Sequence, residues 1–147
     1  MRILAFAVAI LLVASIAAKT SYSQSLLRPS DSKTVAKGSL IYKQHCSSCH
    51  GKNLEGAPSW RLRLPNGKLP APPHDESGHT WHHSDKILFS LTKQGPTKII
   101  GGDYKSDMPG FDKILTDDQI IEVLSYIKSR WPKEIQKRHN LLNERSR

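Results

Sequence analysis

Apolar and polar residues follow a helical spacing most clearly in the last third of the chain. The apolar positions recur every three or four residues, at Ile120, Val123, Leu124 and Ile127. Just before them, Thr116-Asp117-Asp118-Gln119 has the spacing of a capping box, in which side chains satisfy the first free backbone N–H groups. Trp131-Pro132 should end or kink the helix, because proline has no N–H to donate. The pattern predicts a helix between these two signals.

An earlier helix is predicted from about Ser32 to Cys46. Its apolar stripe consists of Val35, Leu40 and Ile41. Asp31 or Ser32 is a suitable cap, because a short polar side chain accepts hydrogen bonds from the first turn.

A short helix is predicted between these two, from about Ser84 to Thr92. Its apolar face consists of Ile87, Leu88 and Leu91. Ser84 is a good N-cap, and Gly95-Pro96 is a strong stop signal after the last turn. The sequence shows no strand pattern and no internal repeat, so the predicted fold class is all-α.

The segments between the predicted helices are long and rich in turn-forming residues. Residues 51–83 contain many glycines and prolines, and residues 96–115 form a second loop around Gly101-Gly102 and Met108-Pro109-Gly110-Phe111. Loops of this length are unusual inside an ordinary packed domain. They are expected where a chain wraps around a cofactor.

The N-terminal segment predicts export. Arg2 precedes an uncharged, mostly apolar run over 3–18, and small and polar residues follow. This is typical of a secretory signal peptide over residues 1–23, cleaved after Ser23 or near Ala18. An uncleaved membrane anchor is the alternative, although the run is short for a bilayer span of about 20 residues. In both cases the body of the protein is expected beyond the membrane, and a periplasmic location with no span after cleavage is predicted.

The rest of the chain has the length of one domain. Residues 24–31 are interpreted as a polar linker, residues 32–132 as the domain, and residues 133–147 as a charged tail that offers a short extra helix. Apolar residues make up 37% of the whole chain, leader included. A domain with so few apolar residues for its core usually needs an additional stabilising link, and a covalently held cofactor can provide one.

The chain is basic, with 22 Lys and Arg against 13 Asp and Glu. After removal of the leader the excess is about +7. Basic charge favours partners with an acidic surface, because opposite charges steer the encounter. Nucleic acid is disfavoured, since no recognition motif or basic-aromatic platform is present.

The two cysteines of the chain occur in one run, Cys46-Ser47-Ser48-Cys49-His50. The pattern C-x-x-C-H is the attachment signature of a c-type haem. Each thiol can add to a haem vinyl group to form a thioether, and the adjacent histidine is the proximal iron ligand. The run therefore predicts one haem c, held covalently by Cys46 and Cys49, with His50 on the iron.

Three other interpretations of the cysteine pair remain open. A redox dithiol requires a βαβ context and has no use for the histidine. A zinc site would take two more ligands from the histidines of the long loop, His74, His79, His82 and His83. A structural disulfide is possible in an oxidising compartment, although a two-residue gap ending in histidine is an unusual place for one.

Met108 is the single methionine of the chain after the leader, and it is the predicted second axial ligand. Thioether sulfur is a soft ligand, and Met/His ligation raises the haem potential into the range of electron carriers. The loop around Met108-Pro109 can be rigid enough to hold the sulfur. The alternatives are a gap-filling core methionine and a second histidine ligand from the loop, which would lower the potential.

Two further residues are candidates for contacts near the haem. Trp81 has a donor-only indole N–H that can reach a propionate, or its ring can pack on the haem edge. His50 needs an acceptor for its other ring nitrogen. Pro72 is the candidate acceptor, because proline offers a carbonyl and no donor; Pro58 and Pro73 are alternatives.

These features together resemble class I c-type cytochromes, in particular the mono-haem bacterial members, over roughly residues 33–130. The strongest elements are the Cys46–His50 run and Met108-Pro109, and a weaker one is Gly38-x-x-x-Tyr42. In that family a glycine and an aromatic of the first helix cross the last helix against an aromatic, which Tyr126 matches. The resemblance implies a cytochrome c fold of three to five helices around one haem.

The resemblance also implies a function. It predicts a non-enzymatic electron-transfer protein whose iron cycles between Fe(III) and Fe(II), with a dehydrogenase, an oxidase or another cytochrome as partner. The rival is a haem-based ligand sensor or redox enzyme subunit with a labile sixth ligand. Residues 60–83 depart from the short family pattern, which leaves the propionate contacts open and favours a partner surface specific to a subfamily.

Overall fold

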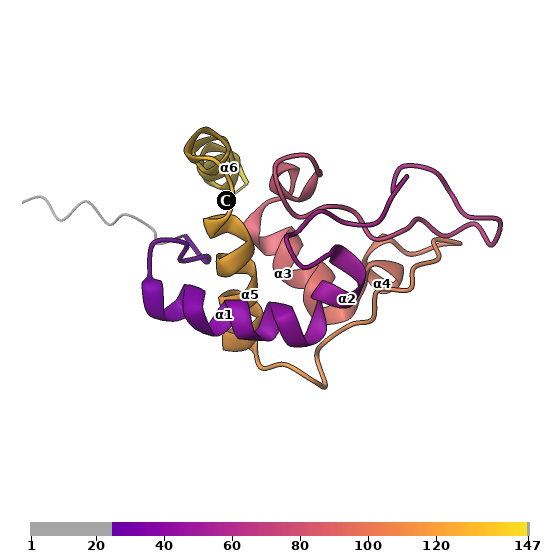
Figure 1. Ribbon diagram of the computed structural model, residues 1–147, viewed down its shortest axis with the longest axis horizontal. Helices are drawn as coiled ribbons and strands as arrows, with labels where there is room; N and C mark the ends of the chain where they lie inside the picture. The colour runs from indigo at the N-terminus through magenta and orange to yellow at the C-terminus, as the bar shows by residue number, and fades with distance from the viewer. Residues whose placement is uncertain (1–24, 147) are drawn as a thin grey trace, which may run out of the picture.

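The computed structural model describes residues 25–146, and all regular structure in this range is helical (Figure 1). The elements are α1 (Ser32–His45), α2 (Ser47–His50), the 3-10 helix η1 (Thr80–His82), α3 (Asp85–Gln94), α4 (Pro96–Ile100), α5 (Asp117–Ser129) and α6 (Lys133–Arg145). The predicted all-α fold is confirmed. The predicted signal peptide lies outside the described residues.

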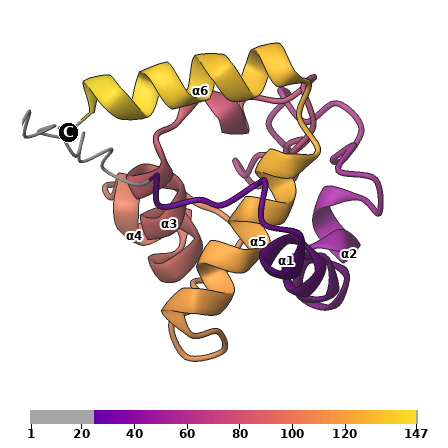
Figure 2. The ribbon, with the colours of Figure 1, turned by 90° about the vertical axis from the view of Figure 1, so that its left-hand side faces the viewer.

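Helices α1 and α5 cross in close contact, as Figures 1 and 2 show. Gly38 lies at the crossing, where a Cβ would stand only 2.0 Å from the carbonyl oxygen of Glu122. One turn further along α1, the ring of Tyr42 lies 5.5 Å from that of Tyr126. Only glycine permits this approach of the two backbones, which offsets its low helix propensity. The helix pairing implied by the resemblance is present.

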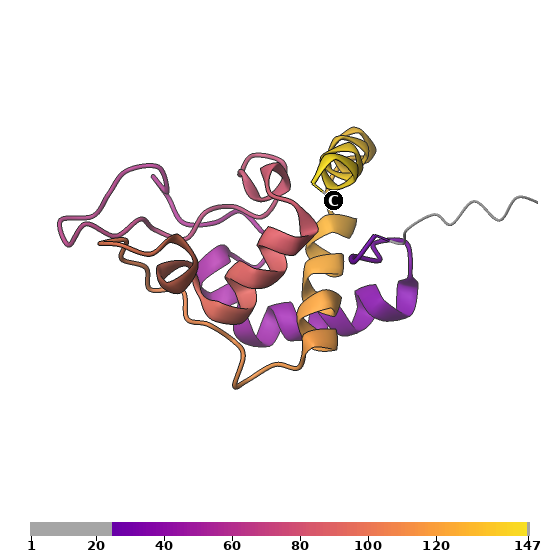
Figure 3. The ribbon, with the colours of Figure 1, turned by 180° about the vertical axis from the view of Figure 1, so that it is seen from behind.

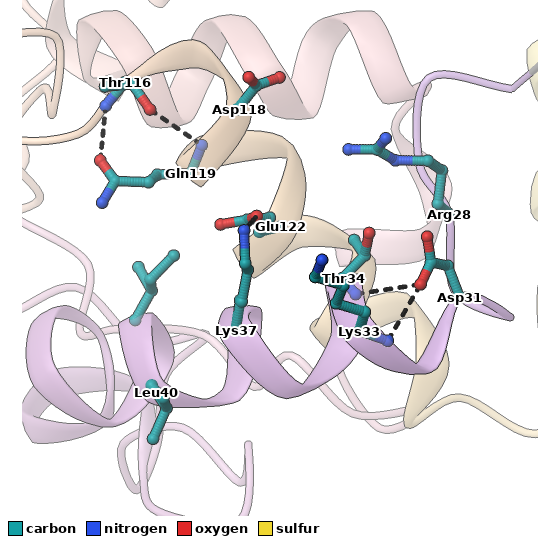
Figure 4. A pocket seen from close by; sticks show the side chains of 11 residues that line it. Arg28, Asp31, Lys33, Thr34, Lys37, Leu40, Thr116, Asp118, Gln119 and Glu122 are labelled. Atoms are coloured by element: carbon teal, nitrogen blue, oxygen red, sulfur yellow. Dashed lines mark hydrogen bonds and ion pairs between the residues drawn. The ribbon is translucent and has the colours of Figure 1, made fainter.

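The caps of α1 and α5 are both side-chain caps, and they line one open groove between the two helices (Figure 4). The carboxylate of Asp31 accepts from the backbone N–H groups of Lys33 and Thr34, at 3.0 and 3.2 Å. Thr116 and Gln119 form the predicted capping box, at 2.9 and 3.3 Å. Sequence capping rules therefore located both helix starts.

The predicted apolar stripe of α1 is only partly right. Ile41 is buried, but Leu40 is 69% exposed. The residues that α1 buries are Thr34, Gly38, Ile41 and Tyr42. Close backbone approach selects small residues at the crossing, so an apolar periodicity does not mark the buried face.

Helix α3 begins at the predicted cap, Ser84, whose hydroxyl accepts from the N–H of Ile87 at 3.4 Å. Leu88 is buried as predicted, whereas Ile87 is 45% exposed. Gly95 has φ +83°, which ends α3 and lets Pro96 begin α4. The segment that contains this short helix was predicted to be a loop. It forms a helix because proline is well accommodated at the first helical position.

Both ends of the described chain pack on the domain. The segment interpreted as a linker is partly buried, and the extra helix predicted in the tail is present as α6. Leu27 is 2% exposed, and the N–H of Arg28 donates to the hydroxyl of Ser125 at 2.9 Å. The tail forms α6, which lies across the C-terminal end of α5 (Figures 2 and 3) and buries His139 completely. The domain therefore includes residues outside 32–132.

One buried carboxylate, Asp85 at the start of α3, joins these ends. It accepts from the hydroxyl of Ser25 at 2.8 Å, from the side-chain amide of Asn143 at 2.9 Å, and from the N–H of Leu27 at 3.2 Å. Lys128 Nζ and His139 Nδ1 lie 3.8 and 3.6 Å from it. We call Ser25, Asp85, Lys128, His139 and Asn143 the Asp85 clasp.

The outer parts of the two long loops run side by side at one end of the molecule (Figures 1 and 3), whereas η1, at the end of the first loop, packs on α6. The two loops are joined by an ion pair between Lys68 of the first loop and Asp107 of the second. Asp107 directly precedes Met108. The segment that carries Met108 is therefore tied to the first loop.

Candidate haem site

The two thiols of the C-x-x-C-H run lie one helical turn apart. Helix α1 ends at His45, and Cys46 continues the turn because its N–H donates to the carbonyl of Tyr42 at 2.9 Å. The N–H of His50 then donates to the carbonyl of Cys46 at 3.0 Å. Positions three apart in a helix lie on the same side, so Cys46 and Cys49 face one direction.

Both cysteines are free thiols, and Cys46 is partly buried. Burial, with a smaller contribution from the neighbouring Cys49, raises the pKa of the Cys46 thiol to about 11. A catalytic dithiol has a lowered thiol pKa, because the thiolate is its nucleophile. The redox-dithiol interpretation therefore does not fit this pair.

His50 is 6% exposed, and its ring is held by a backbone acceptor. Nδ1 lies 2.8 Å from the carbonyl oxygen of Pro72, the acceptor nominated from the sequence. Because a carbonyl only accepts, Nδ1 carries the proton and Nε2 keeps its lone pair. Burial lowers the pKa of His50, although the Pro72 bond opposes this shift. The result is a neutral imidazole with a free Nε2, the form that binds metals.

The backbone after His50 is also fixed. The hydroxyl of Tyr42 donates toward the carbonyls of His50 and Gly51, at 3.3 and 2.9 Å. The N–H of Gly56 donates to the His50 carbonyl at 2.8 Å. Gly51 has φ +81°, which turns the chain directly after the histidine. Helix α1 thus positions both the thiols and the imidazole.

Met108 lies in a loop that is anchored on both sides. Its own N–H donates to the hydroxyl of Ser106 at 3.1 Å. Beyond it, the N–H groups of Phe111 and Asp112 each donate at 3.0 Å to carbonyls at the end of α3. Phe111 is buried, and Met108 is partly buried against the core. The backbone on both sides of Met108 is therefore anchored, and ligation of iron by its sulfur stays a prediction.

The loop histidines do not form one cluster in the structure, although the rings of His79 and His83 meet edge to face at 5.4 Å. His74 stacks on His50, with ring centroids 3.9 Å apart. His79 stacks on Trp60 at 5.3 Å, and His82 lies against Trp81 at 3.8 Å. Within residues 25–146 no three His, Cys, Asp or Glu side chains are grouped as metal ligands. The zinc alternative therefore has no ligand set in that range.

Trp81 has a partner within the protein. Its indole N–H donates to the carbonyl of Glu76 at 3.3 Å, and its ring is partly buried against the core. A contact of Trp81 with a haem propionate stays a prediction. The sequence indicates Trp131 only as the end of a helix, but its indole also forms a contact close to the site. Its N–H donates to the carbonyl of His74 at 2.7 Å, and it is 3% exposed.

The donor set fits a covalently attached haem: two thiols one turn apart, a neutral buried imidazole with a free Nε2, and an anchored thioether. A family model described as Cytochrome c matches residues 35–131. The chain belongs to the cytochrome c family. No curated protein and no solved structure matches the chain.

Membership of the cytochrome c family supplies the cofactor and the general activity. Proteins of this family carry covalently bound haem c and act mainly in electron transfer, and they are typically exported. Among residues 25–146, no helix has the length and apolar character needed to cross a bilayer. The family match covers residues 35–131, so α6 lies outside it. The clasp residues that come from the chain ends, Ser25, His139 and Asn143, also lie outside the match.

Proposed function

We propose that this cytochrome is a mono-haem electron carrier with His50 and Met108 as axial ligands. Haem supplies one-electron Fe(III)/Fe(II) chemistry when bound, and Cys46 and Cys49 hold it through thioethers. The single observation that carries the proposal is the 2.8 Å bond from His50 Nδ1 to Pro72, because it leaves Nε2 free and fixes the ring before iron binds.

Support for Met108 comes from its uniqueness and its surroundings. No other thioether follows the leader, and the loop that carries Met108 is bonded to α3 on one side and to Lys68 through Asp107 on the other. With both axial positions occupied by protein side chains, the protein offers no open position for a substrate. This favours electron transfer over ligand sensing or catalysis.

The proposed partner is a redox protein with an acidic face, such as a dehydrogenase, an oxidase or another cytochrome. Residues 59–70, which we call the basic loop, contain Arg61, Arg63 and Lys68 and no acidic residue. Between these cations, Leu62 and Leu64 are 68% and 43% exposed. An exposed apolar pair within like charges fits a small, transient interface with an acidic, partly apolar surface.

The basic loop has a defined shape. The N–H of Ala57 donates to the carbonyl of Ala71 at 2.8 Å, which closes the loop at its base. The N–H of Leu64 donates to the carbonyl of Lys68 at 2.9 Å, which forms an inner turn. A preorganised loop loses little conformational entropy when it binds, which favours rapid association. We further propose a bacterial, periplasmic setting, on the basis of the predicted leader.

Optical spectra test the ligands. The haem-loaded protein should be low-spin, should show the red charge-transfer band of methionine-ligated ferric haem, and should not bind carbon monoxide. Met108→Ala should lose the band and bind carbon monoxide, while Lys105→Ala, an exposed neighbour in the same loop, should behave as wild type. A wild-type protein that binds carbon monoxide readily would favour the sensor or enzyme interpretation instead.

Two small oxidants of opposite charge test the basic loop. Ferricyanide stands in for an acidic surface, and tris(phenanthroline)cobalt(III) is the cationic counterpart. Replacing both loop arginines by glutamate should slow ferricyanide by about tenfold at low salt and speed the cobalt complex. The double variant Lys137→Glu/Arg138→Glu on α6 makes the same change of charge on another face and is the matched control (Figure 1). Equal effects of the loop variant and this control would contradict the proposed surface.

A further inference from the structure

The imidazole of His74 lies flat on that of His50. Their centroids are 3.9 Å apart and their planes differ by 21°. The two rings come from segments 24 residues apart in the chain, and the polyproline pair Pro72-Pro73 brings them together because Pro72 also accepts from His50. The carbonyl of Pro72 thus contacts one edge of the His50 ring, and the ring of His74 covers one face.

His74 is itself held by four contacts. Its N–H donates to the carbonyl of Leu54 at 2.7 Å, and its carbonyl accepts from the indole of Trp131 at 2.7 Å. Its Nδ1 lies 2.8 Å from the hydroxyl of Thr80, and its ring meets Tyr42 edge to face at 6.4 Å. These contacts hold the His74 ring in a fixed position beside His50.

The proton positions follow from the partners of Thr80. The Thr80 hydroxyl lies 3.3 Å from the carbonyl of Pro73, which only accepts. A relay in which His74 Nδ1–H donates to the hydroxyl, and the hydroxyl donates to Pro73, uses both contacts. Within residues 25–146 no acceptor bonds to the other ring nitrogen, Nε2, so these contacts place a single proton on the ring, and the face toward His50 is that of a neutral imidazole.

We propose that His74 is a positioning residue for the proximal ligand: by stacking on His50 it sets the rotation of that ring and stabilises the ferric state. This inference rests on the proposed function only in requiring His50 as the iron ligand. The bond to Pro72 fixes one ring edge, and rotation of His50 about its Cβ–Cγ bond would break the stack.

The direction of the effect follows from the electrostatics of an aromatic face. The face of a neutral ring is electron-rich, so it interacts more favourably with a partner that carries more positive charge. A histidine bound to ferric iron carries more positive charge than one bound to ferrous iron. The stack therefore favours the ferric form, and its loss should raise the midpoint potential.

The test compares His74→Leu, His74→Phe and His82→Leu in the haem-loaded protein. His82 is an exposed histidine of the same segment and serves as the matched control. We expect His74→Leu to favour the ferrous form about threefold, which is roughly 30 mV for a one-electron couple. Its ferric electron paramagnetic resonance g values should also change, because they depend on the orientation of the axial imidazole. His74→Phe, which keeps an aromatic face, should stay near wild type in both measurements.

Two outcomes would overturn the proposal. The first is a His74→Leu protein with the potential and g values of the His82→Leu control. The second is equal shifts in His74→Leu and His74→Phe, which would assign the effect to the Thr80 hydrogen bond. Thr80→Val, which keeps the ring and removes that bond, separates the two roles even if His74→Leu does not mature. A wild-type spectrum lacking histidine-ligated haem would contradict the proposed function instead, and is seen before any variant is made.

Discussion

Replacing Asp85 by asparagine should destabilise this cytochrome by about 3–5 kcal/mol, because it leaves a buried charge without a counter-charge. Lys128 is 1% exposed, and within residues 25–146 its Nζ has no hydrogen-bond partner. The carboxylate of Asp85, 3.8 Å away, is its counter-charge in the clasp. A small domain has a total stability of about 5–15 kcal/mol, so the loss should be large on that scale.

The second half of this prediction separates charge from packing. Lys128→Met leaves Asp85 with its three donors, namely Ser25, Leu27 and Asn143, so the carboxylate stays satisfied. We expect this variant to cost about 1–3 kcal/mol. The double variant should be more stable than Asp85→Asn alone, because the methionine removes the orphaned charge.

The assay is guanidinium unfolding of the haem-loaded proteins, followed by far-ultraviolet circular dichroism, with a check that the slope is unchanged. Burial lowers the pKa of Lys128 below 10.5, so the folded protein loses the ammonium proton at a lower pH than the unfolded chain does. Unfolding therefore takes up a proton in the pH window between the lowered pKa and 10.5, and the cost of the buried ammonium should shrink as pH rises through that window. An Asp85→Asn cost below about 1 kcal/mol would refute the reasoning, as would a double variant no more stable than the single one.

Three further predictions concern the helices and the clasp. Gly38→Ala should cost about 3 kcal/mol or more in the same assay, because its methyl would overlap the Glu122 carbonyl; Gly67→Ala, with open space and only φ +81° to strain it, should cost about 1 kcal/mol. Thr116→Ala removes one half of the capping box and should cost about 1 kcal/mol, and Thr116→Ser should restore most of it. Burial, with Lys128 nearby, lowers the pKa of His139, so unfolding releases this ring to take up a proton below pH 6.5. Stability should therefore be full above pH 6.5 and fall as pH is lowered, and His139→Gln should flatten the pH dependence; an unchanged slope between pH 5 and 6.5 would contradict this.

Local signals account for most of what the sequence predicted correctly. The capping box at Thr116, the cap at Ser84 and the helical spacing of the last helix all act within a few residues, so the sequence alone reveals them. Leu40 was misassigned because the α1–α5 crossing selects small residues rather than apolar ones, and the fold decides this. The tail helix was predicted, but the packing of the linker and of that helix on the domain was not, because their buried partners, such as Asp85, are about 60 residues away.

For the site, the chemistry was predictable and the supporting contacts were not. The C-x-x-C-H run and a lone methionine are recognisable from residue types and spacing. The stack of His74 on His50 and the bond from Trp131 to the His74 carbonyl depend on long-range packing. One signal was available: an acceptor at Pro72 brings the residues after it, His74 included, next to the proximal ring.

The Asp85 clasp also bears on the order in which the chain is made and folded. Ser25 is among the first residues to follow the predicted leader, whereas Asn143 lies in α6, after the whole region that the family model matches. Both donate to the same carboxylate, so the clasp closes only after α6 has emerged. Until then, α1 and the two cysteines that follow it belong to a chain whose ends are not yet joined at Asp85. Cys46 and Cys49 therefore precede the last member of the clasp along the chain, and they are made while the two chain ends are still apart.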